Sequence, residues 1–350
     1  MFSGLPFGYM FLSIMGLGTL LAVSSIHWLS IWAGLEINLI GFLPLLIYQK
    51  GISESESAVK YFVMQALGSS FLIFGSLMTF GSSFTWDLYS NSYFGVLGIV
   101  MLSAGVCIKL GLFPFHYWLP GVMAGLPWLP CLLLATWQKF APLFLLLCLF
   151  ELNQSYTMVY MFCVISMGSS LIGGFGGVNQ TQIRALLAYS SIGHLGWMTF
   201  AALHSEWTMK MYLSIYILIS LSMFTSLWLS DSGSIKNINN LKISTLMQAS
   251  IMLLLLSLGG LPPLLGFIPK LLVVTVGSAG PWLFMIFMLI IGSLLSLFYY
   301  LSLFFSFFLS SMKKYGLSGS EMSINIMIMI NVINLIGGIV ILMINLMTSM

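Results

Sequence analysis

The sequence predicts an all-α membrane protein of about eleven transmembrane helices, because it is apolar, poor in charge and divided into windows of membrane-spanning length. Hydrophobic residues make up 59% of the 350 positions and charged residues 5%. Soluble domains carry about 25% charged residues. Because so few charges cannot cover a soluble surface of this size, most of the chain must be surrounded by lipid.

The individual spans follow from the length that the bilayer requires. A helix needs about 20 apolar residues to cross the hydrocarbon core. Such windows lie roughly at 6–25, 27–48, 58–80, 93–119, 128–149, 156–177, 184–203, 208–229, 244–276, 281–309 and 324–347. The longest polar stretches between them are Gln49–Ser57, Ser230–Ser244 and Ser310–Ser323. None of these could fold alone, so residues 1–350 are predicted to form a single polytopic membrane domain.

The loops also predict the orientation of the chain, since Lys and Arg accumulate on the cytoplasmic or matrix side of membrane proteins. The loops on the side of the N-terminus contain seven basic residues, and those on the opposite side contain only Lys210. The sequence therefore places the N-terminus on the positive-inside face and, for an odd number of spans, the C-terminus on the other. The seven are Lys50, Lys60, Arg184, Lys236, Lys242, Lys313 and Lys314.

Two of the spans contain proline where a helix cannot continue, because proline lacks a backbone donor and clashes with the preceding turn. These spans are the fourth and the ninth, which predicts two inverted five-helix repeats at 6–150 and 155–310 and an extra C-terminal helix at 323–347. Broken helices at matching places in two inverted halves indicate a transport site. The expected helix-breaking prolines are Pro114, Pro262, Pro263 and Pro269.

Five ionisable residues are singled out because they lie in mid-span, away from the span ends. Each would cost about 2.5–3.5 kcal/mol if charged at the bilayer centre. Five together would cost on the order of 10 kcal/mol, which is comparable with the total stability of a domain, about 5–15 kcal/mol. They must therefore face the interior and be paired, hydrated or neutral. These residues are Glu36, Lys109, Lys139, His194 and Lys270.

Such residues suit a proton relay, because burial favours the neutral form of an amine and a nearby carboxylate favours the charged form. Structural roles remain open for most of them. Glu36 could only hold two helices together, Lys109 and Lys270 could cap carbonyls freed by the breaks, and His194 could be a satisfied packing residue. Lys139 lies too far from either end of its span to reach water.

Other residue patterns do not indicate a catalytic or metal site. The four cysteines lie in apolar runs without the spacing of metal ligands. The glycine-rich segment 173–177 ends a lipid-embedded helix, so it predicts close helix packing rather than phosphate binding. The cysteines are Cys107, Cys131, Cys148 and Cys163.

Motifs over about residues 20–275 resemble the family of NADH:ubiquinone oxidoreductase chain 2, an antiporter-like subunit of the membrane arm of mitochondrial complex I. The last two spans match it only in hydropathy and position. The motifs are Ile26-His-Trp-Leu-Ser-Ile-Trp-Ala-Gly-Leu-Glu36-Ile-Asn-Leu, Glu56-Ser-Ala-Val-Lys60-Tyr-Phe, Lys109 through Trp118, Trp137-Gln-Lys139-Phe-Ala-Pro142, Gly176-Gly-Val-Asn-Gln-Thr through His194-Leu-Gly-Trp197-Met, and Leu258-Gly-Gly-Leu-Pro-Pro-Leu-Leu-Gly-Phe-Ile-Pro-Lys270.

The resemblance implies a proton-translocating subunit of the inner mitochondrial membrane, with its N-terminus in the matrix and its C-terminus in the intermembrane space. It implies a carboxylate–lysine pair at Glu36 and Lys109 and an axis through Lys139, His194 and Lys270. Energy would come from NADH oxidation and ubiquinone reduction in partner subunits. NAD, FMN, iron–sulfur clusters and ubiquinone would therefore be used by other complex I subunits and not by this chain.

Two other functions remain open from the sequence. The chain could be a free-standing cation/proton antiporter, although Glu36 is the only acid in the middle of a predicted span. It could also be a structural or assembly subunit without its own proton path, since buried charges can be purely structural.

Overall fold

The computed structural model describes residues 7–48, 51–88, 96–152, 155–230 and 245–311, with short helical pieces at 328–329, 331–332, 334–335 and 337–339. This part of the chain is helical apart from turns and one isolated β-bridge between His27 and Asp87, which confirms the all-α prediction. Six of its helices are long and apolar enough to cross a membrane. The predicted helix at 323–347 lies mostly outside the described residues.

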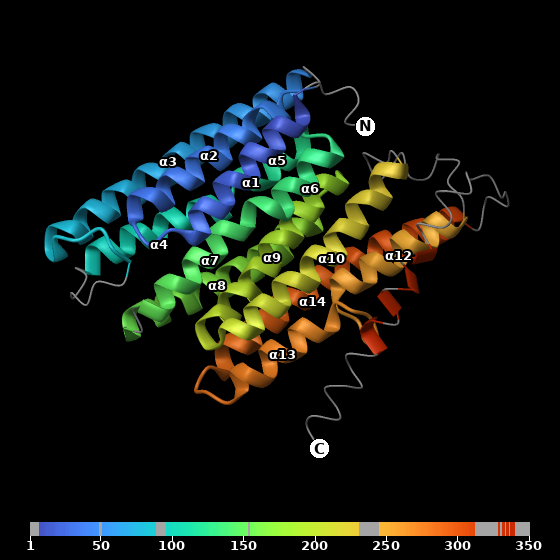
Figure 1. The fold of residues 1–350 in the computed structure, drawn as a ribbon. Helices are drawn as coiled ribbons and strands as arrows, with labels where there is room; N and C mark the ends of the chain where they lie inside the picture. The colour runs from blue at the N-terminus through green and yellow to red at the C-terminus, as the bar shows by residue number, and fades with distance from the viewer. Residues whose placement is uncertain are drawn as a thin grey trace. The chain divides into compact units, whose positions relative to one another are not determined.

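The chain divides into two compact units, Met1–Phe162 and Cys163–Met350. Helix α8 (Tyr156–Val178) crosses the boundary between them. The helices of the first unit, coloured from blue to green in Figure 1, are α1 (Gly8–Ser24), α2 (Trp28–Leu46), α3 (Ile52–Ser83), α4 (Val96–Leu110), α5 (Trp118–Gly125), α6 (Trp128–Ala135) and α7 (Trp137–Leu152).

The second unit contains the end of α8 and five further helices among the described residues. Its helix α9 contacts α10, α13 and α14, so α9 is surrounded by neighbours within this unit. These helices are α9 (Ile183–His204), α10 (Glu206–Ser230), α12 (Thr245–Gly259), α13 (Phe267–Ser278) and α14 (Leu283–Ser311).

Glycines bring α1 and α2 into close contact in the first unit. A Cβ atom at Gly18 would lie 2.5 Å from the backbone nitrogen of Asn38, and one at Gly34 would lie 2.6 Å from that of Ala22. Small residues at such crossings let helix backbones approach each other, which favours helix association in lipid. This contact fixes the position of α2 along the axis of α1, and α2 carries Glu36.

Both predicted helix breaks occur, and they have the same local geometry. Helix α4 ends before Gly111 and α12 ends before Gly260, and these glycines have φ values of 75° and 79°. In each case the glycine and the next residue donate to one carbonyl of the preceding turn, that of Cys107 or Leu256. This is the Schellman ending that a left-handed glycine permits.

The prolines lie where the helices are interrupted or resume. Pro114 lies between α4 and α5, and Pro262 and Pro263 lie between α12 and α13. Pro269 lies in the first turn of α13, where a helix tolerates proline because the backbone donors there have no partner within the helix.

Several helix boundaries differ from the predicted spans; for example, α5 continues to Gly125, although the fourth span was expected to end at residue 119. Helix α3 begins at Ile52 instead of near residue 58, so the polar segment expected as a loop forms its first turns. The fifth span is divided at Thr136 into α6 and α7. Pro142 lies inside α7, where it leaves the carbonyl of Gln138 without its backbone donor. The interruption places Lys139 in the first turn of α7.

The glycine contact between α1 and α2 gives a testable prediction. Gly18→Ala should destabilise the protein by about 1–3 kcal/mol, the usual cost of overpacking, because its Cβ would meet backbone and not a movable side chain. Thermal unfolding of the protein in its membrane assembly measures the effect. Gly16→Ala is the matched control, since nothing lies within 4 Å of its Cβ position. Equal stability of the two variants would contradict the packing account.

Candidate functional site

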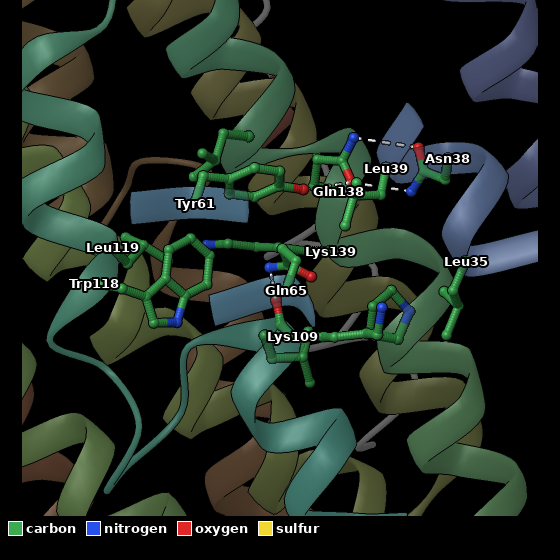
Figure 2. Close-up of a pocket in the computed structure, with 13 residues that line it drawn as sticks. Leu35, Asn38, Leu39, Tyr61, Gln65, Lys109, Trp118, Leu119, Gln138 and Lys139 are labelled. Carbon is green, nitrogen blue, oxygen red and sulfur yellow. Dashed lines mark hydrogen bonds between the residues drawn. The ribbon is translucent and has the colours of Figure 1, made fainter. Parts of the chain in front are cut away.

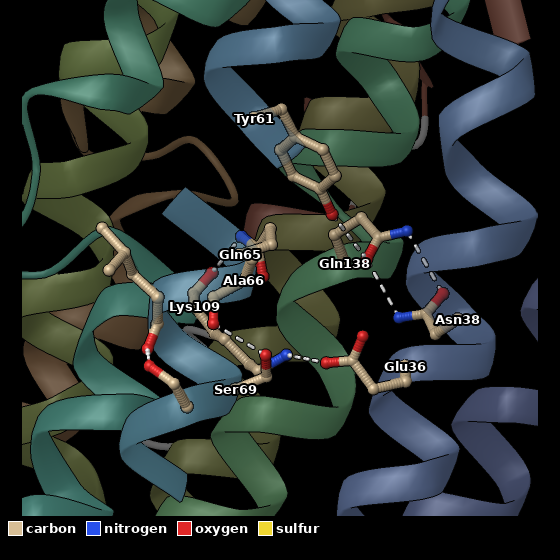
Figure 3. Close-up of polar contacts among 10 residues, drawn as sticks. Glu36, Asn38, Tyr61, Gln65, Ala66, Ser69, Lys109 and Gln138 are labelled. Carbon is tan, nitrogen blue, oxygen red and sulfur yellow. Dashed lines mark hydrogen bonds and ion pairs between the residues drawn. The ribbon is translucent and has the colours of Figure 1, made fainter. Parts of the chain in front are cut away.

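Glu36 and Lys109 form an ion pair inside the first unit. The Lys109 Nζ lies 3.6 Å from Glu36 Oε1, and the two side chains are 3% and 25% exposed. Figure 3 shows Glu36 of α2 reaching toward the amine from α4. The separation is that of an ion pair and is longer than a hydrogen bond of ordinary length. A carboxylate at this distance stabilises the ammonium form of a buried lysine.

Lys139 is 2% exposed and reaches the same cavity as Lys109 (Figure 2). The cavity has space of the order of one water molecule. Its polar lining comes from four helices, α2, α3, α4 and α7. The polar or charged residues that line it are Asn38, Tyr61, Gln65, Lys109, Gln138 and Lys139.

A neutral polar network lies beside these charges. Asn38 and Gln138 exchange two side-chain hydrogen bonds, of 2.9 Å and 3.2 Å, which join α2 to α7. The Tyr61 hydroxyl of α3 also donates to Gln138 Oε1 at 3.3 Å, and Gln138 Nε2 donates to Met15 Sδ at 3.4 Å. Figure 3 shows the three side chains meeting. The network holds the first turn of α7 and therefore the backbone of Lys139.

Side chains also satisfy the carbonyls freed where α4 ends. Trp118 Nε1 donates to the Ile108 carbonyl at 3.2 Å, and Gln65 Nε2 donates to the Lys109 carbonyl at 3.4 Å. Backbone groups inside a membrane need such partners, because no bulk water reaches them. The end of α4, which presents Lys109, is thereby fixed.

Lys270 occupies the corresponding break of the second unit. Its Nζ donates to the Gly259 carbonyl at 2.9 Å, at the end of α12. A Cβ at Gly260 would lie 3.0 Å from the same amine, so glycine leaves room for the side chain. Lys270 therefore caps a carbonyl freed by the helix break, which is the structural role that the sequence left open for it. It also places the amine at the negative end of the α12 dipole.

His194 and Lys270 line one cavity in the second unit. Nδ1 of His194 is 2.9 Å from the Tyr212 hydroxyl, and its ring also lies against Tyr216, with centroids 5.2 Å apart. The cavity has space of the order of one water molecule. Besides these two residues, its polar lining consists of hydroxyls and one indole, from Ser170, Ser190, Ser293, Ser296, Tyr300 and Trp197.

The structure thus groups the five predicted residues into two clusters. Glu36, Lys109 and Lys139 meet in the first unit, and His194 and Lys270 meet in the second. Within the described residues, no three His, Cys, Asp or Glu side chains gather closely enough to hold a metal ion.

Sequence reasoning missed most of the supporting residues, above all Asn38 and Tyr61. The sequence did contain a signal for such residues, because an amide or hydroxyl side chain buried in an apolar helix needs a hydrogen-bond partner. The partner could not be identified from one sequence, since Asn38 and Gln138 lie 100 positions apart.

Residues 25–296 match the family of membrane domains described as NADH:quinone oxidoreductase/Mrp antiporter. The chain is 41% identical to NADH-ubiquinone oxidoreductase chain 2 of Anopheles gambiae over 311 residues, covering 87% of this chain and 86% of that one. It is 38% identical to the chain of the same name in Mus musculus over 291 residues, covering 83% of each.

The fold of this chain is also similar to the folds of chains in solved structures. The fold is similar to a chain in respiratory complex I from Thermus thermophilus with bound aureothin, with a TM-score of 0.83 and 26% identity. That similarity covers 95% of this chain and 78% of the other. A chain of the Mrp complex from Dietzia sp. has a TM-score of 0.75 at 15% identity, covering 84% and 59%, and so is similar in fold alone.

The amide network gives a testable prediction. Gln138→Leu should destabilise the protein by about 1–3 kcal/mol, because Asn38 and Tyr61 then lose a buried partner. Adding Asn38→Leu should cost less than the sum of the two single changes, since the residues share one interaction. Thermal unfolding of the four members of this cycle measures the coupling. Additive effects would show that the two side chains do not act as a pair.

Proposed function

The chain belongs to the NADH:quinone oxidoreductase/Mrp antiporter family of membrane subunits, and on that premise we propose that its two buried amine clusters carry protons across the membrane. The protein is an antiporter-like membrane subunit of respiratory complex I, and other subunits of that complex are its partners. The observation that supports this proposal is the burial of Lys109 and Lys139 around one polar cavity, with Glu36 paired to Lys109.

The first cluster can hold or release a proton according to the position of Glu36. While the carboxylate stays near Lys109, it stabilises the ammonium against the cost of burial. If Glu36 moves away, the same amine loses that stabilisation and gives its proton to water in the cavity. Lys139 lines this cavity and is the acceptor in the proposal.

The second cluster repeats this principle with different groups. The Gly259 carbonyl and the end of α12 stabilise a charged Lys270. His194 adds a second group that can take a proton, and Tyr212 holds its ring. We propose that Glu36, Lys109, Lys139, His194 and Lys270 are the residues through which this subunit moves protons.

The energy must come from outside the chain. Moving one charge against the membrane potential costs about 2.3 kcal/mol per 100 mV. We propose that NADH oxidation and ubiquinone reduction in partner subunits supply it, with NAD, FMN, iron–sulfur clusters and ubiquinone bound there. The chain then contributes proton translocation to the complex, and the redox chemistry takes place elsewhere.

The orientation and the internal repeat belong to the proposal. We place the protein in the mitochondrial inner membrane with its N-terminus in the matrix, because of the uneven distribution of basic residues in the loops. The equal endings of α4 and α12 at Gly111 and Gly260 support a relation between residues 6–150 and 155–310. An inverted relation places the two breaks in equivalent positions of the two halves.

Two alternative functions differ in what they require. A free-standing cation/proton antiporter needs no redox partner, so the purified chain would exchange ions by itself. A purely structural subunit needs its buried lysines only for stability, so a well-packed neutral residue could replace Lys139 without loss of pumping.

Lys139→Met tests the relay directly. Methionine fills a similar space without a proton, so the complex should assemble while proton pumping coupled to NADH:ubiquinone turnover falls roughly tenfold or more. The measurement is the rate of proton uptake per assembled complex in closed vesicles. Lys210→Met is the control, because Lys210 is half exposed and forms an ion pair with Glu206 one turn away. Normal pumping by Lys139→Met would favour the structural alternative.

The proposed orientation can be tested with cysteines at the two ends of α9. Thr181 and Glu206 are exposed and lie just before and just after this helix. A membrane-impermeant thiol reagent should label Glu206→Cys in mitoplasts, whose outer membrane is ruptured and whose inner membrane is intact. It should label Thr181→Cys only in inverted inner-membrane vesicles. The reverse pattern of labelling would place the N-terminus in the intermembrane space.

A further inference from the structure

Helix α14 contributes a buried phenol to the second cavity. Tyr300 is 1% exposed, and it lines the cavity together with Lys270 and His194. It lies on the same face of α14 as Gly292 and Ser296, each one turn from the next. Gly292 allows this face to approach α8, since its Cβ position is 2.6 Å from the Ser170 carbonyl.

The Tyr300 hydroxyl lacks an ordinary partner. Ser190 and Tyr299 lie close enough to interact with it, yet no described group forms a hydrogen bond of normal geometry with this oxygen. Buried hydroxyls nearly always bond to protein or to ordered water. A water in the cavity would give this hydroxyl a partner of normal geometry.

The other groups of the cavity suit the same water. Each lining serine donates its own proton to a carbonyl one turn back on its helix and presents oxygen lone pairs. The Lys270 ammonium, with three donors, uses one for the Gly259 carbonyl. A buried water needs two to four polar partners, and this lining offers both donors and acceptors. The serines are Ser170, Ser190, Ser293 and Ser296.

We propose that Tyr300 is a proton-relay residue between Lys270 and His194, an inference that rests on the proposed function. The Lys270 ammonium gives a proton to a water in the cavity, and this water passes one of its own protons to the Tyr300 oxygen. Tyr300 releases its hydroxyl proton to Ser190, and Ser190 gives its own hydroxyl proton to His194. Lys270 ends neutral and His194 ends protonated. Ser190 lies one turn from His194 on α9, so both face the cavity. The phenol gains one proton and loses one, so it stays neutral, and rotation of its hydroxyl restores the starting orientation.

Tyr300→Phe tests this role because it removes one oxygen atom and keeps the ring. In the assembled complex, proton-coupled NADH:ubiquinone turnover should fall roughly tenfold, toward the lower end of what positioned acid–base groups contribute. Tyr299→Phe is the matched control. Tyr299 is the adjacent residue and is 2% exposed, but its hydroxyl donates to the Gly173 carbonyl and lies outside the cavity lining. That variant should keep its turnover.

Two measurements distinguish a loss of proton transfer from a loss of packing in these variants. Rates are normalised to assembled complex by electron transfer to an artificial acceptor that bypasses ubiquinone. The solvent deuterium isotope effect on coupled turnover should rise in Tyr300→Phe and not in Tyr299→Phe, since only the first slows a proton transfer. Normal turnover with an unchanged isotope effect in Tyr300→Phe would overturn the inference, as would equal losses in both variants.

A second variant covers the case in which Tyr300→Phe fails to assemble. Ser190→Ala removes the next hydroxyl of the path and should also lower coupled turnover, whereas normal turnover of that variant would overturn the inference.

The underlying function is tested separately by Lys270→Met. If Lys270→Met stops pumping while Tyr300→Phe and Ser190→Ala keep it, the relay through Tyr300 is wrong and the function stands. If Lys270→Met also pumps normally, the function itself fails.

Discussion

The cost of holding charge away from water dominates this structure. A lysine inside the bilayer costs about 2.5–3.5 kcal/mol on insertion scales, and the chain offsets this cost differently at each site. Lys109 has a carboxylate at 3.6 Å, and Lys270 has a helix-end carbonyl at 2.9 Å. Lys139 lies beside a polar cavity and a fixed amide network. In the proposed function the amines exchange protons, whereas in a purely structural role these contacts would only hold the helices together.

The broken helices follow from the same constraint. An uninterrupted helix presents no backbone acceptor to a buried amine, since its carbonyls bond within the helix. A left-handed glycine ends α4 and α12 inside the apolar region and leaves carbonyls that side chains must satisfy. Trp118 and Gln65 satisfy two of them in the first unit, and Lys270 satisfies one in the second. The charged residues and the breaks are thus parts of one arrangement within each unit.

Much of this could be predicted from the sequence, for definite physical reasons. Hydropathy predicts spanning helices because lipid is a uniform solvent, and proline predicts the breaks because it lacks a donor. The division at Thr136 was missed because neither proline nor glycine lies at or next to this residue to mark it. The start of α3 at Ile52 was missed because polarity predicts exposure and not helix ends. Asn38, Tyr61 and Tyr300 could not be placed from one sequence, since the side chains around them come from distant parts of the chain and depend on helix rotation.

The proposed proton path requires water to reach the buried amines through the two cavities. An experimental density map of the assembled complex, at a resolution that shows ordered water, would reveal it. We expect water between Lys109 and Lys139 in the first cavity, and water bonded to Lys270 and Tyr300 in the second. Cavities closed by apolar side chains, with both lysines of the first unit in contact only with protein, would contradict it.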